Sequence, residues 1–265
     1  PSGSAVAVYV VADGCDDYAG NGNTQSDTYD WTHDAVVPTM TITCGAVADG
    51  GSHNAAVTMT FTSSEATGDF ISGDVTATNA ALSSWSAVSS TVYTATVTPS
   101  SANTTPSIVV AANKFTDGAG NNNSSASNTY NWTHDTTVPT MTLTCSNVSS
   151  GGSYNAAVTM TFTSSEATTD FVSGDVKVQA GTSISNWTVV SSSVYTGTIT
   201  PGSEGTVNVM VLGNKFTDGA GNINSVSNTY TWTHDTTVPT MTLSCSAVAD
   251  GGSYNAAVTM TFTSS

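Results

Sequence analysis

Positive charge is almost absent from this sequence. Its 265 residues include no arginine and three lysines (Lys114, Lys177 and Lys215) against 19 acidic residues, which gives a net charge of −16. Such a chain cannot neutralise a phosphate backbone, so we exclude nucleic acid and anionic membranes as partners. Long apolar runs are also absent. None approaches the roughly 18 residues that span a bilayer, and we expect no membrane insertion.

Instead, the sequence contains a repeat of about 100 residues. The segment Phe-Thr-Asp-Gly-Ala-Gly-Asn occurs at 115–121 and 216–222, and Trp-Thr-His-Asp occurs at 31–34, 132–135 and 232–235. The longer segment Asn-Ala-Ala-Val-Thr-Met-Thr-Phe-Thr-Ser-Ser begins at Asn54, Asn155 and Asn255. This period is too long for a solenoid unit and is typical of a single domain.

The phase of the repeat predicts the domain boundaries. Residues 1–34 match only the last third of a repeat, and residues 236–265 match only the first third. We therefore expect whole repeats at 35–135 and 136–235, flanked by partial repeats at 1–34 and 236–265. This phase indicates a window cut from a longer array.

Within a repeat, apolar residues alternate with threonine, as in Met40, Ile42 and Cys44. A period of two is the pattern of strands with one buried face. Turn residues such as Asp117-Gly-Ala-Gly-Asn separate about seven short strands in each repeat. The prediction is an all-β fold, a linear array of tandem immunoglobulin-like β-sandwich domains of about 100 residues each.

The cysteines do not follow the antibody pattern of two in each domain. Cys44, Cys145 and Cys245 each lie in the first strand of a repeat without an in-register partner, and Cys15 is expected at the far pole of the preceding repeat. A bridge between Cys15 and Cys44 would need Cα atoms within about 7 Å. Two interpretations stay open: the strand cysteines are small buried apolar residues, or the cysteines form inter-chain disulfides in an oxidising space.

Three motifs carry a resemblance to a known family. They are Thr-Ser-Ser-Glu-Ala at 62–66 and 163–167, Phe-Thr-Asp-Gly-Ala-Gly-Asn, and the junction Asp135-Thr-Thr-Val-Pro-Thr. In their order and spacing the whole chain resembles the bacterial Ig-like (Big) domains, the tandem modules of large surface adhesins. The resemblance implies an extracellular array on a cell or fibre surface, often stiffened by calcium at the junctions between modules.

Carboxylates recur at fixed places in each repeat. In a sandwich of this topology, the entry to the first strand and two of the turns share one pole, so these side chains should gather there. Three carboxylates with further oxygen ligands suit Ca²⁺, and a divalent ion would relieve their repulsion. The alternative is a solvated acidic surface that keeps the chain soluble. The candidate ligands are Asp34, Glu65 and Asp117 in the first whole repeat, and Asp135, Glu166 and Asp218 in the second.

Catalytic motifs are not found. His33, His134 and His234 each precede an aspartate, but one histidine per repeat gives neither a triad nor a zinc ligand set. We expect these imidazoles to pack or hydrogen-bond near the end of the last strand. The serines lack a nucleophile-elbow motif, and the Gly-rich segment lacks the ending of a phosphate loop. We predict no enzyme activity.

Six asparagines begin an Asn-x-Ser/Thr sequence and are possible N-glycosylation sites. In a chain this rich in Ser, Thr and Asn, some arise by chance. The six are Asn103, Asn122, Asn123, Asn131, Asn147 and Asn186.

Two functions fit these observations. The first is the rod-like stalk of a surface adhesin, in which calcium stiffens the joints. The second is the building block of an extracellular filament, in which copies pack laterally through the same outer face of every repeat and inter-chain disulfides link them. The partners are accordingly neighbouring copies or further repeats of a longer chain, and the sequence identifies no receptor. A sugar-binding module would need an exposed aromatic platform, whereas Trp85 and Trp187 are better explained as core residues.

Overall fold

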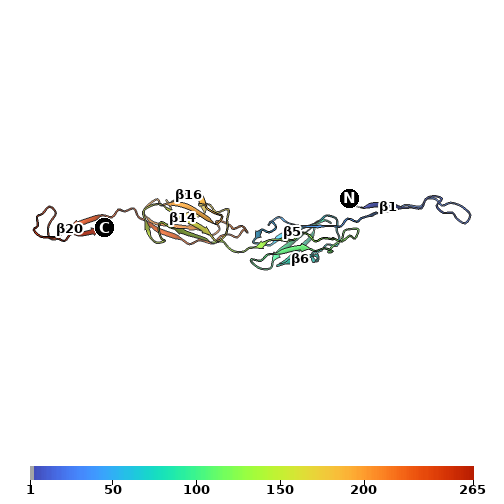
Figure 1. Ribbon diagram of the computed structural model, residues 1–265, viewed down its shortest axis with the longest axis horizontal. Helices are drawn as coiled ribbons and strands as arrows, with labels where there is room; N and C mark the ends of the chain where they lie inside the picture. Colours follow the sequence, from blue (N-terminus) through green and yellow to red (C-terminus); the bar gives the residue numbers. More distant parts are fainter. Residues whose placement is uncertain (1–2) are drawn as a thin grey trace. The chain divides into compact units, whose positions relative to one another are not determined.

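The computed structural model describes residues 3–265, and almost all of its regular structure is β-strand. The chain divides into two compact units (Figure 1). One comprises Pro1–Thr137 with Gly219–Asn222, and the other comprises Val138–Asp218 with Ile223–Ser265. No helix of the described residues is long and apolar enough to cross a membrane.

The larger sheet of the first unit has four antiparallel strands in the order β3-β5-β8-β7. Threonine alternates with apolar residues along them, and burial follows the same alternation, so one face of the sheet covers the core. A bulge between Ser83 and Ser86 interrupts the pairing of β7 with β8. The strands are β3 (Met40–Cys44), β5 (Val57–Ser63), β7 (Ala80–Ala87) and β8 (Val92–Pro99).

Facing this sheet are a three-stranded antiparallel sheet in the order β10-β9-β6 and a short parallel pair, β11 with β4. A single 3-10 turn, η1 (Ser72–Asp74), leads from the larger sheet to β6. The strands are β4 (Ser52–His53), β6 (Val75–Thr78), β9 (Ser107–Val110), β10 (Tyr130–Asn131) and β11 (Thr133–His134). Two packed sheets of short strands form the predicted sandwich.

Aromatic residues fill the space between the sheets. Phe70 is 3% exposed and makes edge-on ring contacts with Trp85, Tyr93 and Phe115, at centroid distances of 5.2, 5.1 and 5.2 Å. Trp132 is fully buried in the same core. Trp85 is half-buried against the cluster, in agreement with the core role expected for it.

The second unit repeats this plan. Its larger sheet has the order β12-β14-β17-β16, and its second sheet has the order β13-β19-β18-β15. The last strand is continuous over Tyr230–His234, whereas in the first unit it is divided into β10 and β11. The elements are β12 (Met141–Cys145), β13 (Ser153–Tyr154), β14 (Val158–Ser164), η2 (Ser173–Asp175), β15 (Val176–Val178), β16 (Ser183–Val189), β17 (Val194–Thr200), β18 (Gly205–Val211) and β19 (Tyr230–His234).

Each unit also carries an isolated antiparallel hairpin with exposed apolar residues. The first pairs β1 (Ser4–Val8) with β2 (Tyr29–His33), and Trp31 in it is 46% exposed, whereas its counterpart Trp132 is 0% exposed. The second pairs β20 (Met241–Ser244) with β21 (Thr261–Ser264). These hairpins contain the same sequence motifs as the whole repeats without the rest of a sandwich core.

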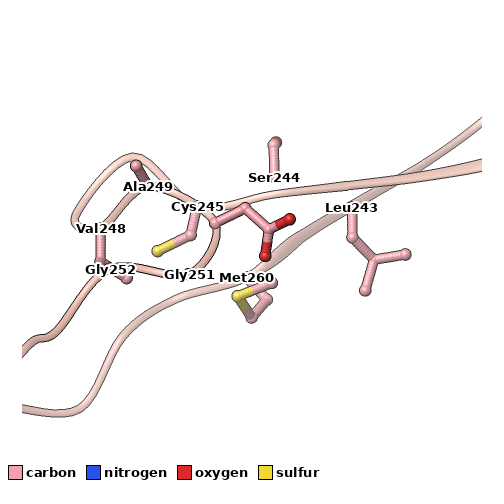
Figure 2. A pocket seen from close by; sticks show the side chains of 9 residues that line it. Leu243, Ser244, Cys245, Val248, Ala249, Gly251, Gly252 and Met260 are labelled. Carbon is pink, nitrogen blue, oxygen red and sulfur yellow. The ribbon is translucent and has the colours of Figure 1, made fainter.

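A hollow of about 630 Å³ lies beside the second hairpin (Figure 2). Val248, Cys245 and Met260 lie around it. In the whole repeats the residues aligned with Val248 accept a hydrogen bond from a core tyrosine: Tyr130 donates to the Val47 carbonyl at 2.6 Å, and Tyr230 donates to that of Val148 at 2.5 Å. Val47 and Val148 are themselves buried in the cores of the whole repeats, so the hollow corresponds to core space of an Ig-like fold.

The aromatic cluster predicts the effect of a matched pair of substitutions. Phe70→Ala should destabilise the first sandwich by about 3–5 kcal/mol, because it removes a buried ring from four aromatic contacts. The adjacent residue, Ile71, is 59% exposed, and Ile71→Ala should change stability by less than about 0.5 kcal/mol. Urea unfolding followed by tryptophan fluorescence measures both. Equal effects of the two variants would contradict this core assignment.

Candidate metal centre

Three carboxylates from distant parts of the sequence meet at one end of the first sandwich. Asp34 follows β2, Glu65 follows β5, and Asp117 lies in the turn after Phe115. One carboxylate oxygen from each lies within 4.8 Å of the others. They line a surface hollow of about 590 Å³, and none of the three lysines is among its lining residues. This is the grouping that the strand topology predicts.

The turn that carries Asp117 holds this carboxylate in place. The Asp117 Oδ1 atom accepts hydrogen bonds from the backbone N–H groups of Ala119 and Asn121, both at 2.9 Å. The Asn121 side-chain amide donates to Asp117 Oδ2 at 2.9 Å and to the Asp34 carbonyl at 3.2 Å. The hydrogen bond from the Asn121 side chain is the main cause that lowers the pKa of Asp117, so this group stays ionised although it is only 7% exposed.

Of the three carboxylates, Glu65 has the least favourable environment for a negative charge. Its Oε2 atom is buried and has no hydrogen-bond partner. Desolvation raises the pKa of Glu65, and the negative charges of Asp34 and Asp117 and a side-chain hydrogen bond with Asp117 raise it further. A buried acceptor without a donor is unfavourable, and an ionised one beside two carboxylates is more so. The side chain is therefore placed as a cation ligand would be.

The residues fit a hard divalent cation. All three side chains offer oxygen atoms, which is the ligand type that Ca²⁺ and Mg²⁺ prefer, and the unpartnered Glu65 Oε2 supplies a free ligand atom. With no cation side chain lining the hollow, a bound metal would be the positive charge that lets the three carboxylates ionise together. Asp135, Glu166 and Asp218 form the corresponding group in the second repeat.

A fourth carboxylate, Asp69, supports the site without joining it. Its oxygens accept hydrogen bonds from the Thr116 backbone N–H at 3.0 and 3.1 Å, from the Thr116 hydroxyl at 2.8 Å and from the Thr67 hydroxyl at 2.7 Å. Asp69 thereby connects the turn that follows Glu65 to the turn that contains Asp117. Desolvation opposes the ionised form, but these hydrogen bonds outweigh it and lower the pKa of Asp69.

The sequence did not predict that Asp69 connects the two turns. It also did not predict the two hydrogen bonds donated by the Asn121 amide. The only signal was that both residues recur at the same place in the second repeat, as Asp170 and Asn222. In that repeat Asp170 accepts the same hydrogen bonds from Thr217 and Thr168.

The four cysteines are free within the chain. Cys44 and Cys145 are half-buried and pack against the cores of their sandwiches, Cys245 is half-buried, and Cys15 is exposed. Both interpretations from the sequence therefore stay open, and inter-chain disulfides through these residues stay a prediction.

One of the six possible glycosylation sites must be corrected. Asn123 is fully buried, and its side chain accepts hydrogen bonds from the backbone of Lys114 and Phe115 while donating to Ala111 and Ser125. An amide held in this way cannot carry a glycan in the folded domain. Asn103, Asn122, Asn147 and Asn186 are exposed and Asn131 is half-buried, so these five stay predictions.

Two of the histidines have structural contacts. The Nδ1 atom of His134 lies 2.8 Å from the Ser101 carbonyl, and that of His234 lies 3.1 Å from the Ser203 carbonyl. Each imidazole thus fixes the end of the last strand to a neighbouring loop, as expected. His33 is exposed at the end of the first hairpin.

Comparison with known proteins identifies a family and a set of similar folds. The profile of a bacterial Ig-like domain family matches residues 34–133 and again 135–233. Among curated protein sequences, none matches the chain significantly.

Several solved structures resemble the chain at low identity. The Escherichia coli adhesin FdeC is 15% identical, with a TM-score of 0.41, over 87% of this chain and 74% of that protein. InvD of Yersinia pseudotuberculosis is 18% identical, with a TM-score of 0.34, over 78% and 62%. Invasin, described as a bacterial integrin-binding protein, is 17% identical, with a TM-score of 0.41, over 84% and 46%. The chain thus spans less than two thirds of the last two.

The hydrogen bonds of Asp69 should stabilise the first sandwich, and this stabilisation should decrease at acidic pH. Asp69→Asn should lower the free energy of unfolding of the first sandwich by about 1–2 kcal/mol, because a neutral amide cannot accept all of these hydrogen bonds. The pKa of Asp69 is lower in the folded than in the unfolded protein. Asp69 therefore contributes its full stabilisation at pH values above its unfolded-state pKa. This stabilisation is lost as the pH falls through the folded-state pKa.

Urea unfolding of the two proteins at neutral and at acidic pH measures this difference. Asp30→Asn is the matched control, because Asp30 is exposed in β2. A difference between Asp69→Asn and the unsubstituted chain that is independent of pH would contradict the assignment.

Proposed function

Because the chain belongs to the bacterial Ig-like domain family, we propose that it is a non-catalytic extracellular spacer, part of the stalk of a surface adhesin, whose domains bind Ca²⁺. The observation that carries this proposal is the carboxylate group at the end of the sandwich, in which the buried Glu65 Oε2 has no hydrogen-bond donor. FdeC is described as an adhesin and invasin as an integrin-binding protein, and we propose an adhesive setting for this chain as well.

The site would act through the segment that enters the domain. Asp34 lies before β3, where the Val36 N–H donates to Asp34 Oδ1 at 3.0 Å and the Asn121 amide donates to the Asp34 carbonyl at 3.2 Å. An ion bound by Asp34, Glu65 and Asp117 together would fix this entering segment to two turns of the sandwich. Calcium would then stiffen the chain at the junction between consecutive repeats. Extracellular modules bind Ca²⁺ with dissociation constants of roughly 10⁻⁴–10⁻³ M, and we expect an affinity in this range.

The proposal predicts opposite effects of Glu65→Gln with and without calcium. Without calcium, the pKa of Glu65 is higher in the folded than in the unfolded protein. Ionisation of Glu65 therefore destabilises the folded protein as the pH rises above the unfolded-state pKa of this group. At neutral pH the neutral variant should therefore melt at a higher temperature than the unsubstituted chain. With calcium the order should reverse, because the variant has lost a charged ligand.

Calorimetric titration with CaCl₂ and thermal melts in EDTA and in calcium measure these effects. Glu204→Gln is the matched control: it removes the same charge from a carboxylate that accepts hydrogen bonds from Thr236 and Thr237 outside the acidic groups. If Glu65→Gln and Glu204→Gln respond identically to calcium, Glu65 is not a ligand.

Stiffening itself is tested by small-angle X-ray scattering of the 265-residue chain. Addition of calcium should narrow the distribution of maximum dimensions, and the double variant Glu65→Gln/Glu166→Gln should abolish the change. Calcium binding without any change in scattering would leave the metal site intact but overturn the stalk mechanism.

A further inference from the structure

The segment that follows the last strand has the same sequence in both repeats but different contacts. Residues 132–143 and 232–243 are identical, and in each stretch two threonines come directly after the Trp-Thr-His-Asp motif. We call these two pairs, residues 136–137 and 236–237, the exit segments. In both, the N–H of the second threonine donates to the aspartate two positions before it, at 2.9 Å and 3.0 Å. Any further difference between the exit segments therefore comes from residues outside these stretches.

One loop residue beside each exit segment differs between the repeats. The loop between β17 and β18 contains Glu204, and Asn103 occupies the same place in the loop between β8 and β9. Each directly precedes the residue that pairs with the histidine at the end of the last strand. The two side chains can therefore be compared at one position of the same fold.

Glu204 contacts the second exit segment through several hydrogen bonds. Its Oε1 atom accepts from the Thr236 N–H at 3.0 Å and also from the Thr236 hydroxyl. The Thr237 hydroxyl donates to the same carboxylate, at 3.2 Å from Oε1 and 3.3 Å from Oε2. The hydrogen bond from the Thr236 hydroxyl is the main cause that lowers the pKa of Glu204. The carboxylate is thus ionised at neutral pH, and its hydrogen bonds are charge-assisted.

Asn103 makes a weaker attachment in the first repeat. Its Oδ1 atom accepts from the Thr136 N–H at 3.2 Å. Among residues 3–265, the Thr136 and Thr137 hydroxyls make no hydrogen bond. A carboxamide has one uncharged acceptor oxygen, whereas a carboxylate has two oxygens that share a negative charge. The shorter asparagine side chain therefore cannot reproduce the contacts of Glu204.

We propose that Glu204 is a positioning residue that fixes the second exit segment to its own sandwich without a metal ion. Glu204 lies outside both acidic groups, so this attachment is independent of the proposed calcium sites. The donors are hydroxyl and backbone N–H groups, which suits a chain with only three lysines. Because the exit segments are identical, the residue at this one loop position determines how firmly each repeat holds the chain that follows it.

Hydrogen exchange of the 265-residue chain in EDTA, measured by NMR, tests the proposal. Glu204→Ala should lower the protection of the Thr236 amide at least about fivefold, because this amide loses its acceptor. Asn103→Gly should lower the protection of the Thr136 amide less, and glycine suits the positive φ of 54° at this position. The amide of Val209, a fully buried residue of β18, should keep its protection in Glu204→Ala, as expected if the sandwich stays folded.

A charge control and a second variant complete the test. Asp250→Asn removes a negative charge from an exposed residue of the same unit and should leave the Thr236 amide unchanged. Thr237→Val removes one donor while Glu204 stays in place. In ¹⁵N relaxation measurements, the order parameter of residue 237 should fall from about 0.85 toward about 0.6 in this variant and in Glu204→Ala.

Three results would overturn the inference. The first is unchanged protection of Thr236 in Glu204→Ala together with an unchanged order parameter in Thr237→Val. The second is an equal loss of protection in Asp250→Asn, which would attribute the effect to net charge and not to the hydrogen bonds. The third is an equal loss in the Glu204 and Asn103 variants, which would remove the difference between the two repeats.

Discussion

Repulsion between carboxylates is the constraint that governs the acidic end of each sandwich. Each sandwich brings three of them to one end, and the chain supplies almost no cation to neutralise them. In the first repeat the surrounding hydrogen bonds treat them unequally: the Asn121 amide and two backbone N–H groups favour the ionised form of Asp117, whereas Glu65 is desolvated and its Oε2 atom has no donor. The three carboxylates are thus held close together with no lysine lining the hollow beside them.

Charge is distributed unevenly over each sandwich. Carboxylates gather at the end of the sandwich, while the outer face of the larger sheet contains none over four strands. The core between the sheets depends on aromatic contacts around Phe70 and does not require the acidic group. The acidic group is therefore separate from the aromatic core of the sandwich.

The fold and the grouping of the acidic residues could be predicted because they follow from periodicity and topology. Alternating threonine and apolar residues determine which face of β5 is buried, and the order of strands places Asp34, Glu65 and Asp117 at one end. The different environments of these carboxylates could not be predicted, because they depend on single hydrogen bonds such as that from the Asn121 amide. The burial of Asn123 was missed for the same reason: a sequon specifies a local sequence and carries no information about what surrounds it.

The most direct test of the central claim is a crystal structure of the chain grown with calcium. The account predicts an ion at the end of the first sandwich, bound by Glu65, Asp34 and Asp117 at about 2.3–2.6 Å and completed by further oxygen ligands to six to eight. An ion-free site, with the Glu65 carboxyl protonated and hydrogen-bonded to a neighbouring carboxylate, would contradict it.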